Sequence, residues 1–409
     1  MAKQSNTASM ADGGQSLNPL PYHYALLDYF KSQERELWEW FASAQAKSNY
    51  TESLRLELLK STYRLDTENH PDLYRLADEV KERLGLAVPV TIYQSQAGGG
   101  PNAALYFLPG EGHVVLSGSL ISLLNGEEMK SILGHELAHY VLWTLKEGDF
   151  FILDRLIQAI ACDPRADPPH AQSARWFRLY TEIYADRGAL VATDNVETVV
   201  SGLVKTLTGL QHVSAGSYLK QAEEIFARSR VQTTENSHPE AFIRARALSL
   251  WAGHVPDAAK KIAAMIEGDT SLDDLDLLGQ MRLTELTRRF LAELLRPKWF
   301  QTKPVLAHAR MFFTDFAPAR EPDAALTEEL KFSDSRLQEY LCFLMLDFVV
   351  ADPELEELPL AASLKVAESI NLGSMFEKMV AKELKIRSKD LGKLKAKSAE
   401  LLERAEKSA

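Results

Sequence analysis

Strand-forming sequence is confined to one short stretch of this chain, and helical patterns occupy nearly all of the rest. The segment 88–93 (VPVTIY) is β-branched and aromatic, which predicts a strand. The segments 102–108 (NAALYFL) and 113–117 (HVVLS) predict two more strands, joined through a Pro-Gly turn as a hairpin. A small sheet set among many helices follows from this pattern, so the predicted class is α+β with helix dominant.

Changes in composition divide the 409 residues into five regions. Residues 1–20 are polar and have no apolar period, which predicts a flexible tail. Apolar residues recur every three or four positions over 21–84, as expected of a helical region. The predicted strands and the helices after them make up a domain at 85–255. A helical connector is expected over 256–330 and a helical module over 331–409.

The charge and the cysteines restrict where such a chain works. Acidic residues outnumber basic ones by 57 to 46, which gives a formal charge of −11 and disfavours binding to nucleic acid or anionic membrane. No segment has the roughly 18 uncharged apolar residues that a membrane span needs. The N-terminus lacks the apolar core of a secretory signal. Cys162 and Cys342 form no C-x-x-C pair. We therefore expect a soluble protein of the reducing cytoplasm.

The sequence HELAH at 135–139 carries the clearest chemical signal. His135 and His139 stand at i and i+4, so on a helix they share one face and converge on a point. Asn125, followed three residues later by Glu128, predicts the start of that helix. Glu136 would lie beside a bound zinc without ligating it, which is the place of a general base for water.

A catalytic zinc needs a third protein ligand, and the segment YTEIYADRGAL at 180–190 offers one. Glu182 and Asp186 stand at i and i+4 on a predicted helix. Glu182 could complete a His₂Glu site, and Asp186 could accept a hydrogen bond from the second ring nitrogen of a ligand histidine. The alternative is a solvated acidic face on which Asp186 pairs with Arg187.

HELAH followed by EIYAD resembles the zinc metallopeptidases of the HtpX and CAAX-prenyl-endopeptidase family, which combine H-E-x-x-H with a downstream E-x-x-A-D. The stretches LGLAVPVTIYQS, NAALYF and GHVVLSGSLISLLNGEEMKSILGHELAHY are similar to the strand, edge strand and active-site helix of that family, in the same order. Ser237-His238-Pro239 with Arg244 downstream is similar to its H-P…R element. The resemblance extends over about residues 70–250.

This resemblance implies a zincin-type catalytic domain at 85–255 that binds one zinc ion per chain. His135, His139 and Glu182 would be the zinc ligands, and Glu136 the catalytic base. Asp186 would be the acid that orients a ligand histidine.

The resemblance also implies roles around the reacting peptide. Asn102 and Ala103 match the start of the strand that lines the substrate cleft, where an extended substrate could add as a further strand. His238 would stabilise the oxyanion. The alternative for His238 is an ordinary helix start with Ser237 as N-cap. Arg244 would tie its helix to an acid in the core.

Two other histidines have weaker claims. His113 begins a strand beside a turn, so we expect it at the surface and not as a ligand. His170 lies beside two prolines in the segment between the two site helices, and it is a minor candidate for the cleft.

The predicted function is that of a zinc-dependent endopeptidase of the gluzincin type, acting on a protein or peptide substrate. Better-known members of the resembled family are mostly embedded in membranes, and this chain has no predicted span. The alternative function is a non-catalytic or latent zinc-binding scaffold that acts through its helical extensions. A fourth protein ligand, such as His170 or His238, would favour the scaffold because structural zinc sites are closed.

The segment YLCFLMLDFVVADPELEELPLAASLKVAESINL near the C-terminus is similar to the TerB-like helical module. Its acids after Ala351 stand where that module can hold a divalent ion. A solvated acidic loop between two helices is the simpler interpretation. The segment as a whole is a candidate for binding a protein partner.

Overall fold

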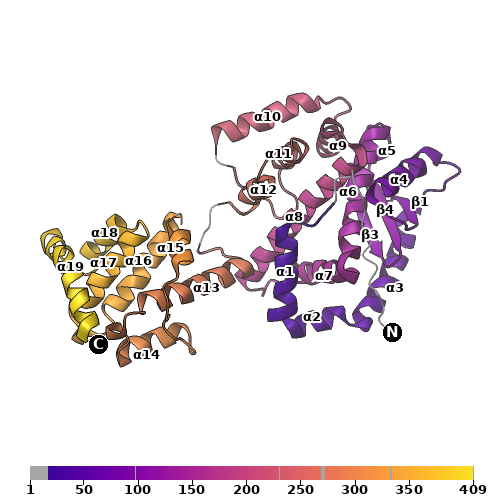
Figure 1. The fold of residues 1–409 in the computed structure, drawn as a ribbon. Helices are drawn as coiled ribbons and strands as arrows, with labels where there is room; N and C mark the ends of the chain where they lie inside the picture. The colour runs from indigo at the N-terminus through magenta and orange to yellow at the C-terminus, as the bar shows by residue number, and fades with distance from the viewer. Residues whose placement is uncertain (1–16, 97, 230, 269–271, 332–333, 409) are drawn as a thin grey trace, which may run out of the picture. The chain divides into compact units, whose positions relative to one another are not determined.

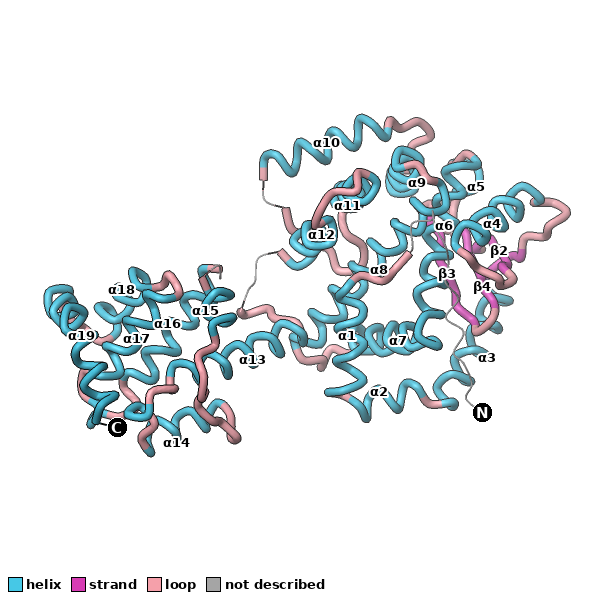
Figure 2. The backbone as a smooth tube through the Cα atoms, in the orientation of Figure 1, coloured by secondary structure: helices cyan, strands magenta, loops and turns pink. Residues whose placement is uncertain are grey.

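The computed structural model describes residues 17–96, 98–229, 231–268, 272–331 and 334–408, so most of the predicted tail lies outside the described residues. The chain forms two compact units, residues 1–269 and 270–409 (Figure 1). Among these residues helices dominate and a four-stranded sheet lies in the first unit, which confirms the predicted α+β class (Figure 2).

The elements of the first unit are, in order, α1 (Pro21–Gln33), α2 (Arg35–Ala42), α3 (Ala44–Ser61), β1 (Thr62–Arg64), α4 (Pro71–Leu84), β2 (Val90–Ser95), β3 (Asn102–Leu108), β4 (Glu111–Ser117), α5 (Leu120–Leu123), α6 (Gly126–Thr144), the 3₁₀ helix η1 (Leu145–Gly148), α7 (Asp149–Cys162), α8 (Pro168–Thr193), α9 (Val196–Thr208), α10 (Ala215–Arg228), α11 (Ala241–Ala252) and α12 (Ala258–Glu267).

The second unit contains α13 (Leu277–Leu294), η2 (Lys298–Phe300), α14 (Lys303–Phe312), α15 (Ala324–Leu330), α16 (Ser335–Val349), η3 (Pro353–Leu355), α17 (Leu358–Ser369), α18 (Gly373–Glu383) and α19 (Ser388–Ser408). It has its own apolar core, to which Phe290, Leu341 and Phe376 belong. No helix in the described part of either unit is long and apolar enough to cross a membrane.

The strands lie in the order β1-β2-β4-β3, so β3 is an edge strand. β3 and β4 form the predicted antiparallel hairpin, which turns at Gly110 in the left-handed region at φ +83°. β2 runs parallel to β4, and β1 pairs antiparallel with β2. β1 was not predicted because three residues are too few to show an alternating pattern.

Both faces of the sheet are covered, because successive side chains of a strand point to opposite faces. Val114 and Leu116 of β4 face the core shared with α4 and α6. Val115 packs instead with Leu58 of α3. His113 shares the face of Val115 and is only 6% exposed, with its Nδ1 3.1 Å from the Tyr93 hydroxyl. The expected surface position of His113 was therefore wrong, because α3 covers that face.

Helices α6 and α8 cross at small residues. A Cβ atom added to Gly188 would lie 2.2 Å from the Cβ of Ala138, and one added to Gly134 would lie 2.7 Å from the Cβ of Ala192. Real Cβ atoms do not approach so closely, so both positions require glycine. This contact sets the distance between the two helices that carry the predicted ligands.

Helix α1 holds the other side of α8 through a fully buried histidine. The Nδ1 of His23 accepts the backbone N–H of Leu20, and its Nε2 lies 3.2 Å from Thr181 Oγ1. The Thr181 hydroxyl donates its own proton to the Phe177 carbonyl, so His23 donates from Nε2 and is neutral. Burial lowers the pKa of His23 to about 3.

Candidate metal centre and cleft

Helix α6 begins as its sequence predicts. Asn125 Oδ1 accepts the backbone N–H of Glu128, and the Glu128 carboxylate accepts that of Asn125, both at 2.9 Å. The other Glu128 contacts are with the Lys205 ammonium at 2.8 Å and the Ser201 hydroxyl at 2.6 Å, both on α9. This buried carboxylate therefore fixes the start of α6 and joins it to α9.

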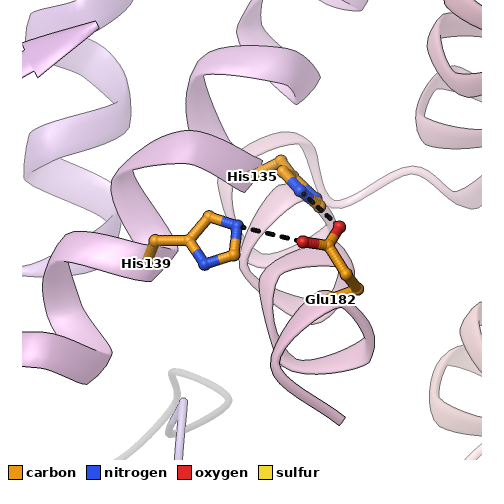
Figure 3. A group of neighbouring side chains, drawn as sticks. All are labelled: His135, His139 and Glu182. Carbon is orange, nitrogen blue, oxygen red and sulfur yellow. Dashed lines mark ion pairs between the residues drawn. The ribbon is translucent and has the colours of Figure 1, made fainter. Parts of the chain in front are cut away.

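Three side chains converge where α6 passes α8. The Nε2 of His135 lies 3.3 Å from one carboxylate oxygen of Glu182, and the Nε2 of His139 lies 3.8 Å from the other (Figure 3). One nitrogen or oxygen atom of each residue lies within 4.8 Å of those of the other two, so the group could hold a metal ion. Among the described residues it is the one such group of three.

The second ring nitrogen of His135, Nδ1, contacts the carboxylate of Asp186. This nitrogen lies 3.0 Å from Asp186 Oδ1, and the Arg244 guanidinium donates to both oxygens of the same carboxylate at 2.6 and 2.7 Å. All three side chains are largely buried. Because Nδ1 donates its proton to Asp186, it is the Nε2 of His135 that would lose its proton and offer a lone pair to a metal ion.

Burial and neighbouring charges divide the site residues into opposite protonation states. Burial opposes charge on His135, but the hydrogen bonds and charges of Asp186 and Glu182 outweigh it and raise its pKa to about 10. His139 has no such hydrogen bond to a carboxylate among the described residues, and burial lowers its pKa to about 4. Burial would raise the pKa of Glu182, yet the contacts with His135 bring it well below its usual value. Burial raises the pKa of Glu136 to about 7.

Glu136 lies between this group and the sheet edge, in a cleft of about 680 Å³. Its carboxylate interacts with the backbone of Leu105 in β3. Asn102 and Ala103, at the start of the same edge strand, also line the cleft. The structure thus brings the predicted substrate strand and the predicted base to one cavity.

His238 reaches the rim of the cleft from the loop before α11. Its Nε2 lies 3.5 Å from a Glu182 oxygen, and its side chain is 60% exposed. The helix-start alternative for Ser237 is wrong, because α11 begins at Ala241 with Glu240 before it. The loop is fixed by Arg175, which donates to the backbone carbonyls of Thr233 and Glu235.

His170 lies elsewhere. Its Nε2 contacts the Glu34 carboxylate at 2.7 Å, and it does not line the cleft. Sequence reasoning missed Asp154, Gln158 and Arg178, which do line it. Arg178 could have been found, since it precedes Glu182 by four residues on one helix face. Asp154 and Gln158 could not, because only the packing of α7 brings them to the cleft.

Two imidazole nitrogens and a carboxylate oxygen at these distances match the donor set that a catalytic zinc site uses, in which three protein ligands leave a fourth position for water. The donor set fits zinc better than magnesium or calcium, which prefer oxygen ligands.

Comparison with known proteins agrees with this site. Residues 68–147 match the model of peptidase family M48, over a segment that includes α4, strands β2–β4 and α6 with both histidines. The match supports a metallopeptidase and ends before Glu182. No curated protein and no solved structure matched the chain.

Proposed function

We propose that this protein is a zinc-dependent endopeptidase, with His135, His139 and Glu182 as zinc ligands. The observation that carries the proposal is the convergence of these side chains beside Glu136, in a cleft with an open strand edge. The match to peptidase family M48 over the same helix supports it independently.

Zinc bound there would supply a Lewis acid and an acidified water. Glu136 would accept a proton from the attacking water and would return a proton to the leaving amine. A pKa near 7 suits a group that must both accept and donate a proton at neutral pH. Asp186, held by Arg244, fixes the ring of His135.

The substrate would bind as an extended strand along β3, beginning at Asn102 and Ala103. β3 is an edge strand, so the backbone groups that face away from β4 can pair with a peptide. His238, exposed at the rim and 3.5 Å from Glu182, is the candidate for stabilising the oxyanion. Of the proteins resembled by the sequence, the HtpX and CAAX-prenyl endopeptidases act by this chemistry, and we propose the same reaction in the cytoplasm.

The test is zinc content by metal analysis, together with cleavage of denatured casein, for wild type and Glu136→Gln. We expect one zinc per chain in both proteins and cleavage only by the wild type. Cleavage by Glu136→Gln at the wild-type rate would refute the assignment of Glu136 as the general base. Zinc in both with cleavage by neither would favour the second candidate function.

That second candidate is a scaffold that binds zinc without catalysis and acts through its helical extensions. The second unit, whose apolar core includes residues from Phe290 to Leu402, is the candidate for this interaction role, and we propose residues 331–409 as a TerB-like module within it. The three-residue ligand group and the position of Glu136 weigh against a purely structural zinc.

A further inference from the structure

The two ends of the cleft differ in chemistry. One end is apolar and is lined by Ile132, Val199 and Leu203, near the start of α6. The other end is lined by Trp143, Asp154, Gln158 and Arg178. Ser131 and Trp143 are twelve residues apart on α6, so the ends are separated by roughly 18 Å along the helix. An extended peptide would reach both.

Arg178 is the unusual residue of the polar end. It lies on α8 one turn before Glu182 and faces the same cleft. Its Nε is buried and has no hydrogen-bond partner among the described residues. Across the described chain no carboxylate lies within ion-pair distance of its guanidinium, whereas Arg175 on the same helix is held by two backbone carbonyls.

Arg178 thus lines the cleft without an ion pair to an acid in the described part of its own chain. A guanidinium in this state can bind a carboxylate, because its planar set of N–H donors matches the two carboxylate oxygens. The nearby Asp154 does not fill this place. Its Oδ2 accepts from Gln158 Nε2 at 2.7 Å, and it acts on Arg178 only through a longer-range charge interaction. Burial raises the pKa of Asp154 to about 7, so its own negative charge is partial at neutral pH.

The direction of the substrate follows from β3. The backbone of Leu105 interacts with Glu136, and two residues further along β3 Phe107 packs on Tyr140 and Trp143, which lie further along α6. β3 and α6 therefore run in the same direction. A peptide antiparallel to β3, the more stable pairing, would place its N-terminal residues toward Trp143 and Arg178.

We propose that the Trp143 end of the cleft is an anion-binding subsite, in which Arg178 receives an Asp or Glu side chain on the N-terminal side of the scissile bond. The effect of this subsite on substrate cleavage rests on the proposed peptidase function. The subsite itself is a binding property and is tested without turnover.

The first experiment measures binding alone. Zinc-loaded Glu136→Gln protein is equilibrated with a peptide library made by digesting a bacterial proteome, and the retained peptides are sequenced by mass spectrometry. We expect enrichment of Asp and Glu, lost in Glu136→Gln/Arg178→Gln and kept in Glu136→Gln/Arg165→Gln. Arg165 is the matched control because it is exposed, pairs with Asp163 and does not line the cleft. No enrichment, or equal enrichment in all three proteins, overturns the proposal.

The second experiment uses cleavage. Peptides spanning the main casein cleavage site carry Glu, Gln or Lys at each of the four positions before the scissile bond. Wild type should prefer Glu over Gln at one position by roughly 10- to 100-fold in kcat/KM, and Arg178→Gln should lose that preference. Asp154→Asn removes a competing charge and should strengthen the preference. A preference for Lys that disappears in Asp154→Asn would refute the role of Arg178.

The two experiments separate the two proposals. Cleavage without a preference for acidic residues refutes the subsite and leaves the peptidase function standing. Acid-selective binding without cleavage of any peptide supports the subsite and refutes the peptidase function.

Discussion

Alanine at Gly188 will force the two site helices apart and weaken zinc binding. The added Cβ would lie 2.2 Å from the Cβ of Ala138, and ordinary contact begins at 3.4 Å, so the helices must separate by about 1.2 Å. Overpacking of this kind costs about 1–3 kcal/mol of folding stability. Ligand distances in a zinc site tolerate only about 0.2 Å. We therefore expect zinc affinity to fall at least tenfold and kcat/KM by about 100-fold.

Zinc affinity is measured by competition with a chromophoric chelator, and stability by urea denaturation. Gly216→Ala is the matched control, because its Cβ would meet only Glu197 at 3.8 Å and alanine favours a helix by up to about 1 kcal/mol. The double variant Gly188→Ala/Ala138→Gly moves the methyl group across the interface and should regain most of the zinc affinity. Wild-type affinity in the single variant, or no recovery in the double variant, would refute the steric reasoning.

Three further results are expected. Asp186→Asn should lose roughly 10- to 100-fold in zinc affinity by chelator competition, because it weakens the hold on His135, whereas Glu136→Gln should keep zinc. His23 binds its proton more weakly when folded, so unfolding by urea should require about 2 kcal/mol less at pH 5 than at pH 7.5, a loss absent in His23→Gln. Lys205→Met leaves the Glu128 carboxylate buried without its cation and should cost about 3–5 kcal/mol, with a much smaller loss when Glu128→Gln is added.

The local features of the site were predictable from the sequence. The i, i+4 spacing of His135 and His139 fixes their shared face on any helix, and the Asn125–Glu128 capping box marks where that helix begins. The same spacing puts Glu182 and Asp186 on one face of α8. Helix periodicity and ligand chemistry are properties of short segments, so they can be predicted without knowledge of the fold.

Features that depend on distant packing were not predictable. His113 is buried only because α3 covers its face of the sheet, and nothing near it in sequence indicates this. Asp154 reaches the cleft through the packing of α7 against α6 and α8. The Gly134–Gly188 crossing joins residues 54 positions apart, and a glycine in a helical pattern does not reveal what it meets.

The charges at the site imply that zinc replaces a proton. Glu182 and Asp186 both contact His135, which raises its pKa to about 10, so the metal-free protein carries a proton on each ring nitrogen at pH 7.5. Zinc needs the Nε2 lone pair, so binding must release that proton, whereas His139 is already neutral and releases none. Calorimetric titrations with zinc at pH 7.5, in buffers of different ionisation enthalpy, should therefore report a proton release that includes the proton of His135. Asp186→Asn lowers the pKa of His135 and should reduce that number. Proton release near zero in the wild type would mean that the two carboxylates do not hold His135 in its charged form.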